Sequence, residues 1–215
     1  MSTEIQSVAT TEQGFAFANK GAFENAQRMA IALTSASLVP KEYQGKENIG
    51  NAIIALEMAQ RLQVSPLMVM QNMHIIHGRP SWSSQFIISA INACGKFSPL
   101  RFDWEGKEGE DAWGCRAYAT ELSTGEVLKG SKVTIKLSKD EGWYSKAGSK
   151  WKTMPEQMLM YRAGAFFGRI YAPEIMNGMQ TREEVLDVLE PTKSGLDALV
   201  EDIPAEVVNE NQEGN

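Results

Sequence analysis

The chain has 215 residues, 43% of them hydrophobic, and a formal net charge of −6. This length is typical of one domain with tails, and the composition can supply a hydrophobic core. No run of 18 apolar residues occurs, which excludes a membrane-spanning helix, and two cysteines are too few for a disulfide framework. The N-terminal sequence is polar and lacks the regions of a secretory signal, so we expect a cytoplasmic, reduced protein.

The N-terminal half predicts helices and one short strand. Apolar residues recur at three- and four-residue intervals over 23–37 and 48–63, which is typical of amphipathic helices. Ser65 is an N-cap followed by proline, and Ser83 is the N-cap of a helix that Gly95 ends. The predicted elements are helices at 23–37, 48–63, 67–71 and 84–93, a strand at 73–77, and a turn at His77-Gly78.

The C-terminal half predicts a meander followed by one long helix. Alternating residues indicate strands at 100–104, 112–120 and 126–135, and the Gly-, Ser- and Lys-rich segment 139–150 is expected to be flexible. Capping boxes at 153–156 and 181–184 predict helices that end near residues 171 and 190. The fold class is therefore α+β: a small antiparallel sheet or hairpin packed with several helices, with disordered termini.

We expect three regions along the chain. Residues 1–22 form a flexible N-terminal segment, residues 23–180 form the core, and residues 181–215 form a short helix with an acidic, largely disordered tail. The last region carries ten acids and two bases, so the rest of the chain has a net charge of +2. The acidic pI therefore describes a tail attached to a mildly basic body, and such tails often bind partners.

Residues 129–169 combine positive charge with aromatic rings. They hold nine Lys and Arg against three acids, a net charge of +6, and Trp143, Tyr144 and Trp151 lie among the lysines. Proteins bind single-stranded nucleic acid with cations, which contact the phosphates, and with aromatic rings, which stack on the bases. A solvated, lysine-rich surface is the alternative interpretation.

Two arginines of the predicted long helix share one face. Arg162 and Arg169 are seven residues apart, so they lie within about 20° of each other around the helix axis. Their neighbours are apolar or small, and an arginine in such surroundings needs an anion. The anions are either successive phosphates of a polynucleotide or carboxylates of the protein itself. Gly164 and Gly168, four residues apart, predict the close approach of another backbone.

Other motifs are weaker evidence for a nucleotide, metal or catalytic site. The segment from Gly125 to Lys132 resembles a P-loop, but its Ser and Lys are in the wrong order and it lies within a predicted hairpin. His74 and His77 would point to opposite sides of a strand, which disfavours a shared metal. Acidic residues between Asp103 and Asp111 fit either a solvated turn or a nuclease that uses Mg²⁺. The sequence therefore favours binding over catalysis, and we expect no required cofactor, with Mg²⁺ only as a modulator.

Seven segments, in this order and spacing, carry a family resemblance. They are NAQRMA (25–30), VPKEY (39–43), ALEMAQR (55–61), SPLMVMQN (65–72), PSWSSQF (80–86), FSPLRF (97–102) and WKTMPEQMLMYRA (151–163). Over residues 23–189 the chain resembles the RecT/Redβ superfamily of phage single-strand annealing proteins, on the RecT-like side. The resemblance implies a protein encoded by a phage or prophage that anneals DNA in homologous recombination and is not an enzyme.

The resemblance also implies an assembly and a mechanism. Protomers of this family form rings or helical filaments, bind single-stranded DNA, add a complementary strand without ATP, and hold the annealed duplex intermediate. It implies two walls of a DNA groove, one at 79–85 and one at the start of the long helix. A distant relative carries further basic residues early in this helix, where this chain has Glu156, Gln157 and Met160, so lysines between 132 and 150 are expected to compensate.

The expected DNA-binding residues come from both walls and from the lysine-rich approach. They are Arg79, Trp82, Ser83, Ser84, Gln85, Lys132, Lys136, Lys150, Trp151, Lys152, Thr153, Arg162 and Arg169. Hydroxyls, amides and the N-terminus of the helix at Ser84 could receive phosphates. The acidic tail is expected to bind a phage exonuclease or the host single-strand binding protein, or to compete with DNA. The remaining alternatives are the Mg²⁺-dependent nuclease and a passive scaffold that coats single strands.

Overall fold

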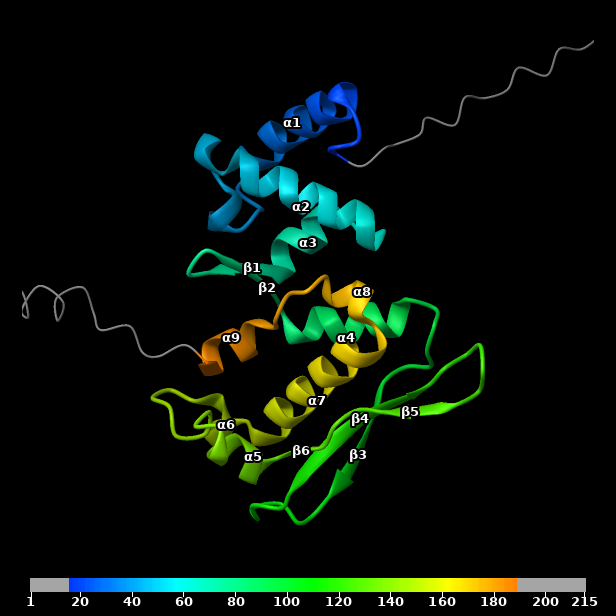
Figure 1. The fold of residues 1–215 in the computed structure, drawn as a ribbon. Coiled ribbons are helices and arrows are strands. Elements are labelled where there is room, and N and C mark those ends of the chain that lie inside the picture. Colours follow the sequence, from blue (N-terminus) through cyan, green and yellow to red (C-terminus); the bar gives the residue numbers. More distant parts are fainter. Residues whose placement is uncertain (1–15, 189–215) are drawn as a thin grey trace, which may run out of the picture.

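A computed structural model describes residues 16–188 of the chain and confirms the predicted α+β class. Figure 1 shows a helical layer at one end, a small sheet at the other end, and helices between them. The expected acidic tail beyond residue 188 and residues 1–15 lie outside the described residues. Among the described helices, none is long and apolar enough to cross a membrane.

The helical layer contains α1 (Lys20–Thr34), α2 (Ile49–Leu62) and α3 (Pro66–Asn72), with two short 3₁₀ turns, Lys41–Tyr43 and Lys46–Asn48, between α1 and α2. The Asn19 side chain caps α1, which therefore begins inside the segment expected to be flexible up to residue 22. The backbone N–H of Ala16 also donates to Glu57 of α2 at 2.9 Å. Residues 16–22 thus include packed structure within the segment that the sequence predicts to be flexible.

A tight hairpin follows the helical layer. Strands β1 (Met73–Ile76) and β2 (Arg79–Trp82) pair antiparallel, with Met73 opposite Trp82. His77 and Gly78 connect them with φ of +48° and +75°, as a two-residue hairpin turn requires. The turn is confirmed, whereas β2 was not predicted as a strand. Helix α4 (Ser84–Ala93) then begins at the Ser83 cap, as predicted.

The sheet contains β3 (Arg101–Glu105), β4 (Gly114–Thr120), β5 (Val127–Lys129) and β6 (Val133–Thr134). Strand β4 pairs with β3 on one side and with both β5 and β6 on the other. The predicted single strand over 126–135 is therefore wrong: it is interrupted at residues 130–132, and α5 (Ile135–Asp140) begins where the Thr134 hydroxyl caps a helix. This helix also occupies the start of the segment that was expected to be flexible.

One helix joins the sheet to the rest of the molecule. After α6 (Lys150–Thr153), α7 (Pro155–Tyr171) packs against β4 and against α4, and short helices α8 (Pro173–Met176) and α9 (Arg182–Val188) follow. Gly164 and Gly168 face α4, where an added Cβ would lie 3.0 Å from Ile88 and 3.1 Å from Ile91. The close approach that these glycines predict is thus the contact between α7 and α4.

The two predicted capping boxes differ. At 181–184 the box forms: Thr181 N–H donates to Glu184 at 2.9 Å, and Glu184 N–H donates to the Thr181 hydroxyl at 3.3 Å. At 153–156 it does not, because Thr153 ends α6 and α7 begins without a side-chain cap.

Helix α9 packs on α7, β1 and β2, so the region boundary that the sequence predicts at residue 181 falls within packed structure.

Candidate nucleic-acid interface

The two walls predicted from the sequence meet in the structure. Helices α4 and α7 pack together, and the Gln85 side-chain amide donates to the Tyr161 hydroxyl at 2.8 Å. The Gln157 amide, one turn before Tyr161, donates to the same hydroxyl at 2.5 Å. These polar groups lie beside a pocket of about 460 Å³ between the segment 146–150, the start of α7, and α9.

Among the described residues, three cations and two acids, Glu183 and Asp187, line this pocket. Lys146 and Lys150 line it from the segment before α7, and Arg182 lines it from the first residue of α9. Lys150 and Arg182 are exposed and form no ion pair with other described residues, whereas the Lys146 ammonium donates to the Leu186 carbonyl at 2.8 Å. We call this surface, with Gln85, Gln157 and Tyr161, the α7–α9 pocket. It offers ammonium, guanidinium, amide and hydroxyl groups, the kinds of group that hold phosphates.

Arg162 is not available to bind phosphate at this pocket. Its side chain is 5% exposed, forms an ion pair with Asp187, and lies 3.9 Å from Glu184. Its guanidinium stacks on Trp143 with 3.8 Å between Cζ and the ring centroid. Burial lowers the pKa of Arg162 and raises the pKa of Asp187 although the two are paired. The predicted DNA contact at Arg162 is therefore corrected: the carboxylate-bridge alternative holds.

Arg169 lies on the same face of α7, as the seven-residue spacing predicts, and contacts the same acid. Its Nη2 donates to both carboxylate oxygens of Glu184 at 2.7 Å. The Glu184 side chain is 4% exposed and that of Arg169 is 44% exposed. Arg169 is thus paired with the protein's own carboxylate but still reaches solvent.

The two tryptophans of the expected site lie in the core. Trp82 and Trp151 are both 0% exposed, so neither ring presents a face to a base. Trp82 stacks on Phe86, and the Trp151 Nε1 donates to Asp187 at 3.0 Å. Their expected stacking role is therefore corrected to core packing. Trp143 is also buried, and it packs at an angle against Trp151 with 5.6 Å between ring centroids.

The N-terminus of α4, expected to receive a phosphate, holds a carboxylate in this structure. Ser83 caps the helix, and the Ser84 N–H and hydroxyl donate to Glu183 of α9 at 3.2 and 2.6 Å. Ser84 is itself buried. Phosphate would reach these donors only if Glu183 moved away.

The remaining predicted residues are spread over the surface. Lys132 pairs with Glu105 of the sheet at 2.7 Å, and Lys136 pairs with Asp140 of α5 at 2.8 Å. Lys152 and Thr153 are exposed on α6, and Arg79 is exposed on the hairpin. Of the predicted set, Lys150 lines the α7–α9 pocket and Gln85 is bonded to a residue that lines it.

Sequence reasoning missed the contribution of α9. Its carboxylates bind three groups that the sequence had offered to phosphates: Glu183 binds Ser84, Glu184 binds Arg169, and Asp187 binds Arg162. Glu184 and Asp187 are three residues apart and so share one face of α9, which is the face that meets the two arginines. Tyr161 and Arg182 were also missed, and nothing in their local pattern distinguishes them.

The acidic residues proposed for a nuclease do not converge. Asp103 pairs with Lys129, Glu105 pairs with Arg116 and Lys132, and Asp111 pairs with Lys139. Within residues 16–188, no group of three or more His, Cys, Asp or Glu side chains is placed to hold a metal ion.

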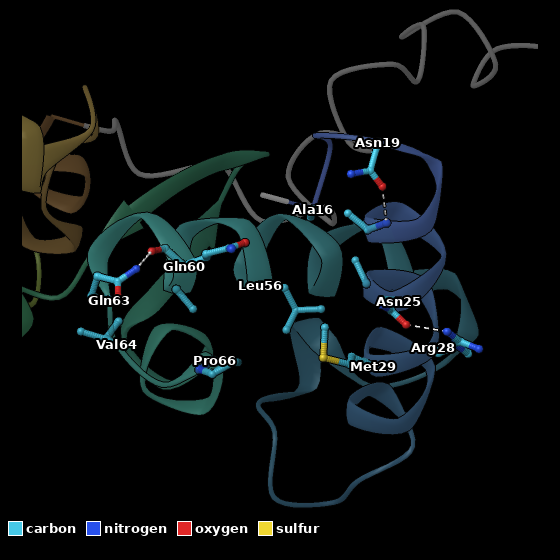
Figure 2. Close-up of a pocket in the computed structure, with 13 residues that line it drawn as sticks. Ala16, Asn19, Asn25, Arg28, Met29, Leu56, Gln60, Gln63, Val64 and Pro66 are labelled. Atoms are coloured by element: carbon cyan, nitrogen blue, oxygen red, sulfur yellow. Dashed lines mark hydrogen bonds between the residues drawn. The ribbon is translucent and has the colours of Figure 1, made fainter. Parts of the chain in front are cut away.

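A larger hollow of about 670 Å³ lies between α1 and α2. Figure 2 shows Leu56 and Met29 inside it and the amides of Asn19, Asn25 and Gln60 around it. Arg28 is the cation that lines this hollow. Its mixture of apolar groups and amides suits a polyanion less well than the α7–α9 pocket does.

The chain was compared with protein-family models, with curated proteins and with solved structures, and none of the three comparisons found a match.

Proposed function

We propose that the protein binds single-stranded DNA and anneals complementary strands without ATP, as a homo-oligomer that grips the DNA backbone. The observation that supports this most is the α7–α9 pocket, where three segments far apart in the sequence contribute Lys150, Arg182 and the Gln85–Tyr161 bond. This is also where the resemblance to RecT-like proteins implies the DNA groove. The proposal thus rests on the family resemblance and on a polar pocket in which three cations face two acids.

The mechanism follows from backbone contacts. Cations around the pocket would neutralise phosphates of the first strand and release its counterions. Amide and hydroxyl groups of Gln157 and Tyr161 would position the backbone without reading its sequence. The Watson–Crick edges would then stay open to a second strand, so that base pairing itself checks complementarity. A buried Arg162 supports the walls of the groove from inside and does not touch the DNA.

Fluorescence anisotropy with a labelled single-stranded oligonucleotide tests the first part of the proposal. We expect binding by the unmodified protein and at least tenfold weaker binding by Lys150→Ala/Arg182→Ala, because two phosphate contacts are lost. The matched control is Lys41→Ala/Lys46→Ala, which removes two cations from the 3₁₀ turns beside α2. Equal binding by both double variants would contradict the placement of the site, and no binding by the unmodified protein would reject the function.

An annealing time course tests the second part. Two complementary oligonucleotides, one carrying a fluorophore and the other a quencher, are mixed with the protein in the absence of ATP. Faster pairing than in buffer supports annealing. Binding without faster pairing identifies a passive coating protein, and shortened strands in the presence of Mg²⁺ identify a nuclease.

A further inference from the structure

The sheet has one covered face and one open face. Cys115, Ala117 and Ala119 of β4 are buried toward α7, which is the helix that packs on this strand. Because side chains alternate along a strand, Arg116 and Tyr118 point to the opposite face. Figure 1 shows α7 along one side of the sheet, at the end of the molecule away from α1–α3. The opposite face is therefore accessible in the described part of the protomer.

The open face carries an ordered row of polar and aromatic groups. Arg101 of β3 lies opposite Tyr118 of β4, and Tyr118 lies opposite Lys129 of β5. Neighbouring strands are about 4.8 Å apart, so Tyr118 lies between Arg101 and Lys129 in the register of the sheet. Arg116 and Lys132 continue the positive charge toward the β6 end of the sheet, where both contact Glu105. We call these five residues the open sheet face.

Two carboxylates accompany the cations but leave a positive excess. Asp103 lies 3.4 Å from the Lys129 ammonium, and Glu105 lies 3.2 Å from Arg116 and 2.7 Å from Lys132. Four cations against two acids give a net charge of +2 on a chain whose total is −6. These ion pairs are exposed or half-buried at the surface, and surface pairs contribute about 1 kcal/mol or less, so phosphates can replace the carboxylates at little cost.

We propose that the open sheet face is a second binding site for single-stranded nucleic acid, separate from the α7–α9 pocket. One base stacks on Tyr118, and phosphates on either side meet Arg101 and Lys129. Stacking of a base on a ring tolerates any sequence, and so do phosphate contacts. This inference rests on the proposed function, because the face then captures a second strand by its backbone and holds it near a strand already bound at the pocket.

The experiment measures capture of a second strand. The protein is loaded with one unlabelled oligonucleotide per protomer, and a labelled, non-complementary oligonucleotide is then titrated in and followed by anisotropy. We expect Arg101→Gln/Lys129→Gln to weaken this capture at least tenfold and Tyr118→Leu to weaken it about tenfold, with Tyr118→Phe close to the unmodified protein. The double variant should bind the first oligonucleotide within about twofold of the unmodified protein, because the pocket is intact.

The controls distinguish failure of the second site from failure of the proposed function. Lys41→Gln/Lys46→Gln removes the same charge elsewhere, and circular dichroism verifies that each variant is folded. If the protein binds a first strand and the face variants capture the second strand normally, the second site is overturned and the proposed function stands. If sedimentation shows that the face variants change subunit number without a loss of capture, the face is a contact between copies and the second site is overturned. If no strand binds at all, both proposals fail.

Discussion

Arg162 shows how a single buried charge can be held by one helix. It lies inside the molecule with Asp187 as its partner, so removal of its guanidinium would leave that buried carboxylate with the Trp151 hydrogen bond but without a cation paired to it. We expect Arg162→Met to lower the free energy of unfolding by about 3–5 kcal/mol, measured by urea denaturation. Arg169→Met should lower it less, because the Arg169 side chain is 44% exposed and Glu184 keeps its bonds to Thr181.

A double variant distinguishes charge from packing at this position. Arg162→Met/Asp187→Leu removes both charges and should recover part of the loss, because a buried ion pair is often no more stable than well-packed apolar groups. The raised pKa of Asp187, caused mainly by burial, supports this expectation. If the double variant were less stable than Arg162→Met alone, the ion pair would not be the origin of the loss.

The chain offers a matched pair of buried tryptophans. Trp82 and Trp151 are both 0% exposed, but the Trp151 Nε1 donates to Asp187, whereas the Trp82 Nε1 has no acceptor among the described residues. Substitution by Phe removes a similar volume at each position. We expect Trp151→Phe to cost about 1.5–3 kcal/mol more than Trp82→Phe, because it also removes a hydrogen bond to a charged group. Equal thermal shifts for the two variants would contradict this assignment.

The residues of the candidate site were only partly predictable. The seven-residue spacing correctly placed Arg162 and Arg169 on one face of a helix, because that relation is local and depends only on helix geometry. Their partners were not identified, since Glu184 and Asp187 lie on a separate helix whose docking depends on tertiary packing. A charge in apolar surroundings indicates that an anion is near, but not whether it belongs to the protein or to a ligand.

At the scale of elements, α9 fills positions that a polyanion would also occupy. Glu183 accepts two hydrogen bonds at the N-terminus of α4 and lines the α7–α9 pocket. If DNA binds there, this carboxylate repels phosphate. We expect Glu183→Gln to bind a single-stranded oligonucleotide several-fold more tightly in anisotropy titrations, since one helix-terminus charge contributes about 0.3–1 kcal/mol.

Glu174→Gln is the matched control for this change. Glu174 lies on α8 and pairs with Lys96 at the surface, away from the residues that line the α7–α9 pocket. The two variants alter the total charge equally, so a general electrostatic effect would tighten binding in both. Tighter binding by Glu183→Gln alone would support the pocket as the DNA site, and weaker binding would count against it.

Helices were easier to predict than strands, for a physical reason. The predicted start and end of α4 match the structure, and those of α2 and α3 differ from it by a residue, because caps and apolar spacing are local signals. The long strand over 126–135 failed because pairing with β4 is interrupted at residues 130–132. Strand β2 was missed because four residues that include a proline do not show alternation.

At the scale of the whole molecule, the charge distribution decides which surfaces can hold DNA. The total charge is −6, so long-range attraction cannot supply affinity for DNA, and the proposed binding would depend on local groups such as Lys150 and Arg182. Each phosphate neutralised on a single strand contributes about −0.7 to the slope of log K against log salt concentration. The slope therefore reports how many cations of this chain act on the strand.

The salt slope gives a test that does not depend on absolute affinity. We expect the slope for Lys150→Ala/Arg182→Ala to be about 1.4 smaller in magnitude than that of the unmodified protein, because two phosphate contacts are lost. Lys41→Ala/Lys46→Ala should leave the slope unchanged, although it removes the same charge. Anisotropy titrations at four or more salt concentrations measure both. An equal reduction in the two variants would mean that the strand responds to the total charge of the protein and not to the α7–α9 pocket.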